Sequence, residues 1–273
     1  MPSLPSLFIS HGAPNLPLAP SPAREFLRHL GHSLPRPQAI LVISAHWQAR
    51  VLSLSSRPQQ YAVHDFGGFP EALYRLRYEP PGAPDLAVQV AGLLEAAGFS
   101  SRLEPQQGLD HGAWVPLLLA YPEAEVPVLQ LSLQRGGDPA LHEALGQAIA
   151  PLRHQGVLIL ASGSVTHNLA ELSLAPSPPP AWARQFSDWL TATIEHGDRP
   201  ALRHYRQLAP AAYRSHPTEE HLLPLFVALG AGGPEAQSLT LHDSYTYHSL
   251  SMAAYAWGDR ADLEALATLP ASA

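Results

Sequence analysis

The sequence contains no cysteine and no lysine, and only 14% of its 273 residues are charged. Without cysteine the chain has no disulfide bond, thiolate metal site, iron–sulfur cluster or cysteine nucleophile. All 16 basic residues are arginine, which we interpret as a coding bias and not as chemistry. The net charge of −7 offers no basic surplus, so we expect no nucleic-acid partner and no attraction to an anionic membrane.

Long hydrophobic runs are also missing. The longest apolar runs, such as AILVISA at 39–45, are far too short to cross a bilayer, so we expect no membrane partner. The N-terminus lacks the charged and apolar regions of a signal peptide, and we therefore expect a cytoplasmic protein. Hydrophobic residues still make up 46% of the chain, which favours a compact globular fold. Histidine is abundant instead, with 15 residues, several of them beside glycine at the ends of apolar runs.

Short apolar runs bounded by glycine and proline predict buried strands at 7–10, 39–45, 126–133 and 157–162. Stretches with helical periodicity predict helices at 21–31, 85–98, 138–153, 181–196 and 219–230. This alternation predicts an α/β fold, a single domain with a central, largely parallel or mixed β-sheet flanked by helices on both faces. We assign residues 1–258 to that domain and 259–273 to a C-terminal tail that packs loosely.

Histidines follow three of the four predicted strands. His11 follows the first strand, His46 follows the second, and His167 lies in the Gly- and Ser-bearing loop after the fourth. Because ligands bind outside the carboxyl ends of parallel strands, we expect these side chains to meet at one edge of the sheet. Neutral imidazoles on rigid strand ends suit a divalent metal such as Fe(II) or Zn(II), and three protein ligands leave positions open for a substrate.

The third ligand is harder to find from the residues alone. The segment at 216–221 predicts a helix start with Thr218 as its cap and two acids in the first turn. There the helix dipole would keep His221 neutral and able to bind a metal, but His221 could equally lie on the surface of the helix. We expect Pro224 to kink the helix soon afterwards.

Two further segments could line such a site. His111 precedes an apolar helix and could be oriented by Asp110 or a neighbouring backbone group; alternatively Asp110 only caps the helix and His111 is exposed. The loop with His64, Asp65 and Phe66 could be a packed Ω-loop or a lid over a flat aromatic substrate. The histidines in helical or polar stretches are expected to be solvated, namely His29, His32, His142, His154, His196 and His204.

Seven segments of the chain occur together, in the same order, in a known family. They are HGAPNLPL at 11–18, PRPQAILVISAHW at 35–47, HDFGGFPEALY at 64–74, GLDHGAWVPL at 108–117, VPVLQLSL at 126–133, ASGSVTHNL at 161–169 and HPTEEHLLPL at 216–225. In these segments, which span nearly the whole chain, the sequence resembles the 4,5-DOPA extradiol dioxygenase family of the class III extradiol superfamily. Each segment alone is modest, whereas seven in register are highly specific.

The resemblance implies one divalent metal, with Fe(II) required for activity and Zn(II) expected in purified protein. It implies that His11, His46 and His221 hold this metal. Better-known members of the wider superfamily use a glutamate as third ligand, so the adjacent Glu220 stays an alternative to His221. Ala13 stands where many relatives have serine, a difference that bears on the polarity of the pocket.

The resemblance also assigns roles around the metal and makes residues 1–258 an extradiol dioxygenase-like catalytic domain. His167 matches the acid–base histidine of the superfamily and could also be a fourth ligand. His111 matches a second active-site histidine that lines the substrate pocket. We expect the loop with His64, Asp65 and Phe66 to bind substrate.

The expected activity is the opening of a catechol-type, DOPA-like ring by O2, so the partners are a small aromatic diol and O2. Two other functions stay open: a zinc-dependent hydrolase that uses the same histidines to activate water, and a non-enzymatic metal-binding member of the superfamily. The presence of both His167 and His111 argues against a pure binder, which needs no proton shuttle. The sequence also allows a homo-oligomer.

Overall fold

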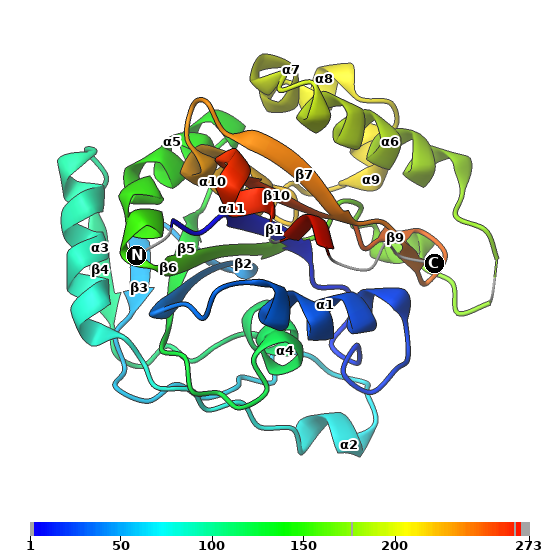
Figure 1. The fold of residues 1–273 in the computed structure, drawn as a ribbon. Helices are drawn as coiled ribbons and strands as arrows, with labels where there is room; N and C mark the ends of the chain where they lie inside the picture. Colours follow the sequence, from blue (N-terminus) through cyan, green and yellow to red (C-terminus); the bar gives the residue numbers. More distant parts are fainter. Residues whose placement is uncertain (1–2, 176, 265, 269–273) are drawn as a thin grey trace.

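An eight-stranded sheet lies at the centre of the structure, a computed structural model that describes residues 3–175, 177–264 and 266–268 (Figure 1). The strands of this sheet are β1 (Ser6–Ser10), β2 (Ala39–Ala49), β3 (Leu52–Ser55), β4 (Ser101–Glu104), β5 (Val128–Gln134), β6 (Val157–Gly163), β7 (Gln237–His242) and β10 (Ala254–Gly258). They lie side by side in the order β4-β3-β5-β2-β6-β1-β10-β7. A separate hairpin pairs β8 (Tyr245–Thr246) with β9 (Leu250–Ser251).

Helices connect most of these strands. The α-helices are α1 (Pro22–Ser33), α2 (Glu71–Tyr74), α3 (Pro84–Ala96), α4 (His111–Ala120), α5 (Pro139–Ile149), α6 (Ala181–Glu195), α7 (Arg199–Arg203), α8 (Tyr205–Leu208), α9 (Ala212–Ser215), α10 (Leu223–Gly232) and α11 (Arg260–Glu264). Short 3-10 turns lie at Ala150–Gln155, Leu169–Glu171 and Leu266–Thr268. None of the helices in these described ranges is long and apolar enough to cross a membrane.

The four predicted strands form the middle of the sheet as β5, β2, β6 and β1, and they run parallel to one another. Strands that the sequence pattern did not predict add the edges. At one side of the sheet, β10 pairs antiparallel with β1, and β7 pairs antiparallel with β10. At the other side, β3 pairs antiparallel with β5. The sheet is therefore mixed, and its parallel block places the carboxyl ends of β1, β2 and β6 together.

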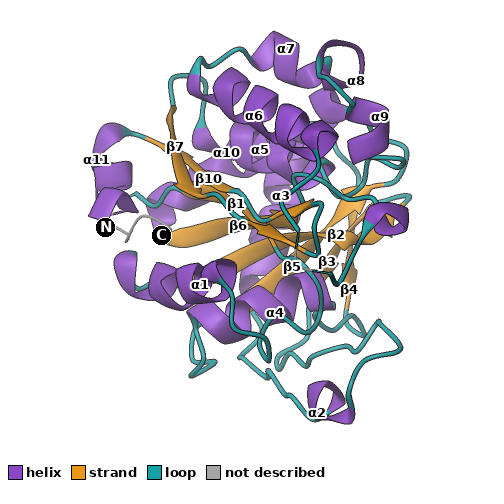
Figure 2. Cartoon of the chain, turned by 90° about the vertical axis from the view of Figure 1, so that its right-hand side faces the viewer, coloured by secondary structure: helices purple, strands orange, loops and turns teal. Residues whose placement is uncertain are grey.

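Helices cover both faces of the sheet, as Figures 1 and 2 show. Along β2 the side chains alternate, so that Leu41 and Ile43 join the core beneath α5 and α10. Ile40 and Val42 join a second core beneath α1 and α4. All four residues are fully buried. This burial on both faces explains why the strand is a continuous apolar run.

Two of the predicted helices begin at a capping side chain. Ser21 accepts a hydrogen bond from a first-turn amide of α1, and Asp138 does the same for α5. The helix predicted at 138–153 is shorter, because α5 ends at Ile149 and the chain continues as a 3-10 turn that contains Pro151. Gly156, with φ of 74°, ends that turn in the left-handed region that favours glycine.

The helix predicted at 219–230 begins later than expected. It starts at Leu223, so Pro224 lies in the first turn, where its missing N–H leaves no hydrogen bond unmade and causes no kink. Thr218 does not cap this helix; its hydroxyl donates to Glu220 at 2.8 Å instead. As a result His221 lies in an irregular turn before the helix and not on its surface.

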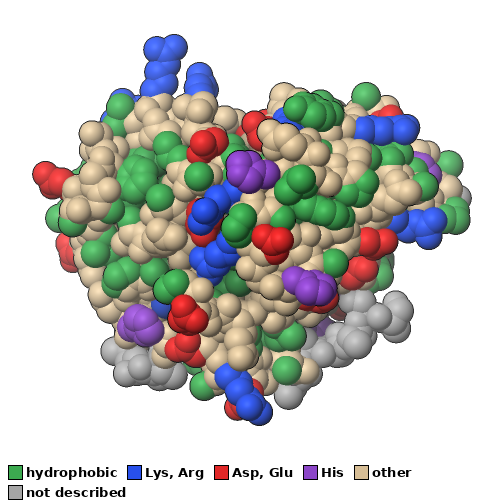
Figure 3. Space-filling model, turned by 90° about the horizontal axis from the view of Figure 1, so that it is seen from above, with side chains coloured by type: hydrophobic (Ala, Val, Ile, Leu, Met, Phe, Trp, Pro, Cys, Tyr) green, Lys and Arg blue, Asp and Glu red, His purple; other side chains and the backbone are tan. Residues whose placement is uncertain are grey.

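The segment after Gly258 packs against the domain, which contradicts the expectation of a loose tail for its described part. Leu263 and Leu266 are buried with the core under α1 and α4. Asp262 forms a buried ion pair with Arg153, at 2.6 Å. Elsewhere, acidic and basic side chains are interspersed on the face shown in Figure 3.

Candidate metal centre

Five histidine rings gather at the carboxyl edge of the parallel strands. The centroid of the His46 ring lies 5.0 Å from that of His11, 4.9 Å from that of His221 and 3.9 Å from that of His111. The His167 ring stacks on the His221 ring, with centroids 3.4 Å apart and planes 7° apart. The structure thus brings together all the histidines that the sequence placed at this edge.

His11 follows the last residue of β1, and its backbone amide donates to Gly163 at the end of β6, at 3.0 Å. His46 lies inside β2, because this strand continues to Ala49 and not only to residue 45. The pairing of β2 with β5 is interrupted between Ile43 and Gln48. Such an irregularity redirects side chains, and here it lies at His46.

The position of His221 depends on a close backbone contact with β6. The amide of Ser164 donates to the carbonyl oxygen of His221 at 2.8 Å. A Cβ atom on Gly163 would lie 2.1 Å from the same oxygen, so only glycine fits there without movement. The side chain of Glu220 accepts a hydrogen bond from His221 Nδ1 at 3.0 Å. The Nε2 atom of His221 is buried and has no partner in the described protein.

The nitrogens of His11, His46 and His221 fit a single divalent ion. Each residue offers one ligand atom, and these atoms lie within 4.8 Å of one another. The Nε2 atoms of His11 and His46 are 3.1 Å apart, close to the roughly 3.3 Å between two nitrogens in a tetrahedral zinc site. A metal ion would also satisfy the orphaned Nε2 of His221. The roles of these residues as ligands stay a prediction.

In His11 and His221, a hydrogen bond from Nδ1 places the ring proton on that nitrogen. Nε2 then keeps the lone pair that a metal ligand needs. Ser162 Oγ donates to the carbonyl of Gly112, so it accepts from His11 Nδ1 at 3.0 Å. This leaves Nε2 of His11 without a proton in the neutral ring. Glu220 fixes His221 in the same tautomer, in the manner of the outer carboxylates that orient metal-binding histidines.

The electrostatic environment keeps these rings neutral. Burial, followed by the neighbouring His46, lowers the pKa of His11 well below 6.5. Burial, followed by His111, lowers the pKa of His46 to about 3. Burial, followed by His167, lowers the pKa of His221 well below 6.5. The neutral imidazole is the form that binds a metal.

His111 begins α4. Asp110 caps this helix as expected, but the His111 ring is not exposed, and Asp65 orients it rather than Asp110 or a neighbouring backbone group. Its side chain is buried, and Nδ1 donates to Asp65 Oδ1 at 2.9 Å. The backbone amide of His111 donates to the same oxygen at 3.0 Å. Asp110 does cap α4 through the amide of Ala113, and it also accepts from Ser44 at 2.6 Å.

His167 is positioned through its backbone, whereas His111 is positioned through a carboxylate bound to its ring. Its backbone amide donates to the carbonyl of Ser215 at 2.8 Å, which fixes the loop after β6. Burial lowers the pKa of His167, although the nearby Glu220 partly opposes this. Its ring nitrogen lies within 4.8 Å of ligand atoms of Glu220 and His221, so it could join them around a metal. Its role as a fourth ligand stays a prediction.

The loop at 64–66 forms an aromatic wall beside His111. The ring of Phe66 meets the His111 ring edge-on, with centroids 5.7 Å apart. The centroid of the His64 ring lies 5.7 Å from that of Phe66 and 5.6 Å from that of Trp114, and its buried Nε2 has no partner among the residues described. Whether His64, Asp65 and Phe66 contact a substrate stays a prediction.

Sequence reasoning missed several buried polar residues. His142 was expected to be solvated, yet it is fully buried; Nδ1 contacts the carbonyl of Asp138 at 2.8 Å and Nε2 accepts from the amide of Gln134. Its position four residues after the capping Asp138 was the available signal. His216 is fully buried as well and donates from Nε2 to the carbonyl of Val165 at 2.8 Å. No sequence signal identified Ser162.

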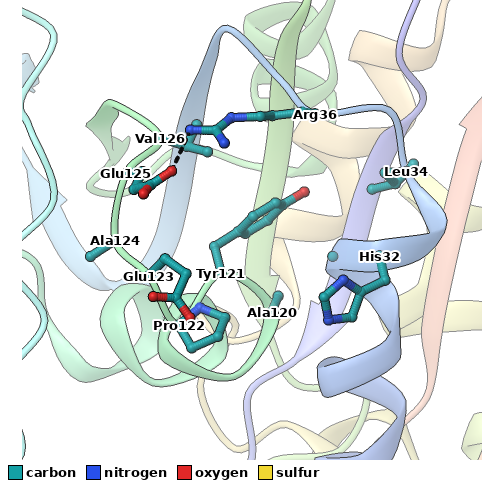
Figure 4. Close-up of a pocket in the computed structure, with 11 residues that line it drawn as sticks. His32, Leu34, Arg36, Ala120, Tyr121, Pro122, Glu123, Ala124, Glu125 and Val126 are labelled. Carbon is teal, nitrogen blue, oxygen red and sulfur yellow. Dashed lines mark hydrogen bonds and ion pairs between the residues drawn. The ribbon is translucent and has the colours of Figure 1, made fainter.

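A separate pocket of about 330 Å³ lies at the other end of α4, where Tyr121 follows the last helical residue. Figure 4 shows the ion pair of Arg36 with Glu125 at this pocket, at 2.8 Å. His111 is at the first residue of α4, so the ten-residue helix, about 15 Å long, separates the two places. The pocket is therefore not part of the metal centre.

Comparison with known proteins identifies the family of the chain. Residues 19–258 match the family described as the catalytic LigB subunit of aromatic ring-opening dioxygenase, a range that includes His46 and His221 but not His11. The chain is 40% identical to a 4,5-DOPA dioxygenase extradiol of Beta vulgaris, over 92% of this chain and 95% of that protein. It is 38% identical to a 4,5-DOPA dioxygenase extradiol of Escherichia coli K12, over 84% of this chain and 85% of that protein.

A solved structure has the same fold. The crystal structure of an uncharacterized protein from Escherichia coli K12 matches 93% of this chain and all of its own, with a TM-score of 0.78 and 32% identity. The mixed sheet of this chain agrees with that fold. The chain belongs to the LigB family of aromatic ring-opening dioxygenases, among the 4,5-DOPA extradiol dioxygenases, and it is an extradiol ring-opening enzyme.

Proposed function

We propose that this enzyme opens the ring of a catechol-type, DOPA-like substrate with O2, using one Fe(II) held by His11, His46 and His221. The observation that carries the proposal is the buried Nε2 of His221. Among the described residues it has no partner, and it is grouped with the facing Nε2 atoms of the other two histidines. The printed names of the relatives support the substrate class. Three neutral nitrogen ligands suit Fe(II) and Zn(II) alike, and only iron has redox chemistry.

When bound, the metal would supply the redox chemistry and would make a coordinated hydroxyl more acidic. The chain's own groups bind and orient the substrate. Phe66 and His64 offer flat rings beside the cluster, which suits an aromatic substrate. The His111 ring lies against that of His46 and the His167 ring against that of His221, so both are placed to accept or return hydroxyl protons of a substrate at the metal.

The ligand set is tested by metal analysis of single variants. We expect His11→Ala, His46→Ala and His221→Ala each to lose most of the bound metal while circular dichroism shows an intact fold. Glu220→Gln should keep an acceptor oxygen for His221 Nδ1 and lose affinity by about 10- to 100-fold at most, as outer-sphere changes do. If His221→Ala retains full occupancy and Glu220→Gln loses it, the third ligand is Glu220.

The reaction is tested by anaerobic loading with Fe(II) or Zn(II) and by oxygen uptake against a panel of catechols. The Fe(II) protein should consume O2 and form a yellow ring-opened product, and the Zn(II) protein should not. Ester hydrolysis by the Zn(II) protein without oxygen uptake would identify a zinc hydrolase instead. Metal binding without turnover of any substrate would identify a non-enzymatic member.

A further inference from the structure

One carboxylate oxygen holds His111 in two ways. Asp65 Oδ1 accepts from the Nδ1 atom of the His111 ring at 2.9 Å and from the His111 backbone amide at 3.0 Å. That amide is one of the first four of α4, which have no partner within the helix. The two bonds together fix both the backbone position and the ring orientation of His111.

The loop that carries Asp65 is itself tied to the start of α4. The amide of Leu109 donates to the carbonyl of Tyr61 at 2.9 Å, and the amide of Val63 donates to the carbonyl of Leu109 at 2.7 Å. The indole of Trp114, one turn into α4, donates to the carbonyl of Val63 at 2.9 Å. Asp65 is therefore a fixed group and not the tip of a free loop.

This arrangement determines what the His111 ring can do. An ionised carboxylate only accepts hydrogen bonds, so Nδ1 of His111 carries the proton. In the neutral ring Nε2 then holds a lone pair, on the side of the ring away from Asp65. The centroid of the His111 ring lies 3.9 Å from that of His46 and 5.6 Å from that of His11. His111 can thus accept a proton beside the metal ligands.

We propose that Asp65 is a positioning residue that sets the tautomer and orientation of His111, so that His111 Nε2 accepts the hydroxyl proton of the substrate. This inference rests on the proposed function. The O–H bond of the substrate breaks, the proton forms a bond to Nε2, and the electron pair stays on the substrate oxygen. Asp65 stays ionised and stabilises the imidazolium that results, as the carboxylate of a catalytic triad does.

Two variants separate orientation from charge. Asp65→Asn keeps an oxygen that can accept from Nδ1 but removes the negative charge, and Asp65→Ala removes both. Asp198→Ala is the matched control, because Asp198 also accepts from an amide at a helix start, at 3.0 Å, but in α7, apart from the histidine cluster. Metal content is measured for every protein so that a loss of metal is not mistaken for a loss of proton transfer.

The first readout needs no turnover. In ¹⁵N NMR of the full-length Zn(II) protein, with the His111 signals assigned by their loss in His111→Gln, the wild type should show a protonated Nδ1 and an unprotonated Nε2. Asp65→Asn should keep this pattern, and Asp65→Ala should lose it. In the Fe(II) protein, both Asp65 variants should lower kcat for a catechol by about 10- to 100-fold with KM little changed, and Asp198→Ala should match the wild type.

Three results would overturn the inference: a wild-type His111 with a protonated Nε2, an unchanged kcat in both Asp65 variants, or a raised KM with unchanged kcat. The last would mean that Asp65 binds substrate directly. A wild-type Fe(II) protein that opens no catechol would refute the proposed function instead, and the NMR pattern would still decide whether Asp65 positions His111.

Discussion

The contact between β6 and His221 makes Gly163→Ala a sharp test of how the site is built. An added Cβ would lie 2.1 Å from the carbonyl oxygen of His221, and ordinary contacts begin near 3.4 Å. The backbone of His221 must therefore move by about 1.3 Å, the difference between these two distances. Metal–ligand distances tolerate only about 0.2 Å. The backbone of Gly163 has no positive φ, so the effect of alanine is purely steric.

We expect Gly163→Ala to destabilise the protein by about 1–3 kcal/mol, the usual effect of overpacking, and to lower metal affinity by at least about 10-fold. Urea unfolding of the metal-free protein and competition with a zinc chelator measure the two effects separately. Gly92→Ala is the control, because Gly92 lies in α3 with open space around it. That change should stabilise the helix by about 0.5–1 kcal/mol.

Wild-type stability together with wild-type zinc affinity in Gly163→Ala would refute the claim that this backbone contact places His221. A large loss of stability with unchanged zinc affinity would also count against it, because the strain would then be absorbed away from the ligand. Only the combined loss, absent from Gly92→Ala, supports the argument.

Three further predictions concern acid, the C-terminal segment and His167. Burial lowers the pKa of His216 to about 3 and that of His242 to about 4, below the ordinary 6.5. Below about pH 6.5 these rings take up protons in the unfolded chain but not in the folded one, so the urea midpoint of the metal-free protein should fall as the pH is lowered from about 6.5 toward 4 for His242 and toward 3 for His216, and should not depend on these rings above that window. Asp262→Ala leaves the buried Arg153 unpaired and should cost about 3–5 kcal/mol in urea unfolding, whereas Glu71→Ala in an exposed pair should cost less than about 1 kcal/mol. His167→Gln should retain metal and lower kcat by about 10²–10⁴-fold, because His167 is expected to transfer a proton in addition to the one that His111 accepts; a loss of metal would make His167 a ligand, and an unchanged kcat would leave His111 as the only proton-transfer group.

The central parallel strands and three histidines of the site could be predicted from the sequence because both signals are local. An apolar run such as residues 39–45 predicts a buried strand by itself, and the rule that parallel strands end at one edge then brings His11, His46 and His167 together. The antiparallel strands β7 and β10 could not be predicted, because β10 is a short run of small and aromatic residues. Its partner β1 is about 250 positions earlier in the chain, so only tertiary contacts select this pairing.

The neighbours of each histidine could not be predicted, and they decide what each ring does. Asp110 was the expected partner of His111 because it is adjacent in sequence, but a residue at a helix N-cap turns its side chain toward the amides of the first turn. The actual partner, Asp65, is 46 positions away. His142 was placed in solvent because it lies in a polar stretch, whereas the fold buries it against Asp138 and Gln134.

The spatial neighbours of His221 and Glu220 also bear on which of the two would bind the metal. From the sequence, the resemblance favours His221 as the third ligand and leaves the adjacent Glu220 as an alternative. In the fold, Oε1 of Glu220 accepts hydrogen bonds from the Thr218 hydroxyl and from His221 Nδ1. This oxygen therefore orients the histidine. The remaining nitrogen, His221 Nε2, is buried and has no partner in the part of the chain that the structure describes. A buried polar atom without a partner is unfavourable by about 1–3 kcal/mol. A metal ion bound at this nitrogen, as proposed above, would remove the penalty and stabilise the fold, and would thereby couple the site to the stability of the domain.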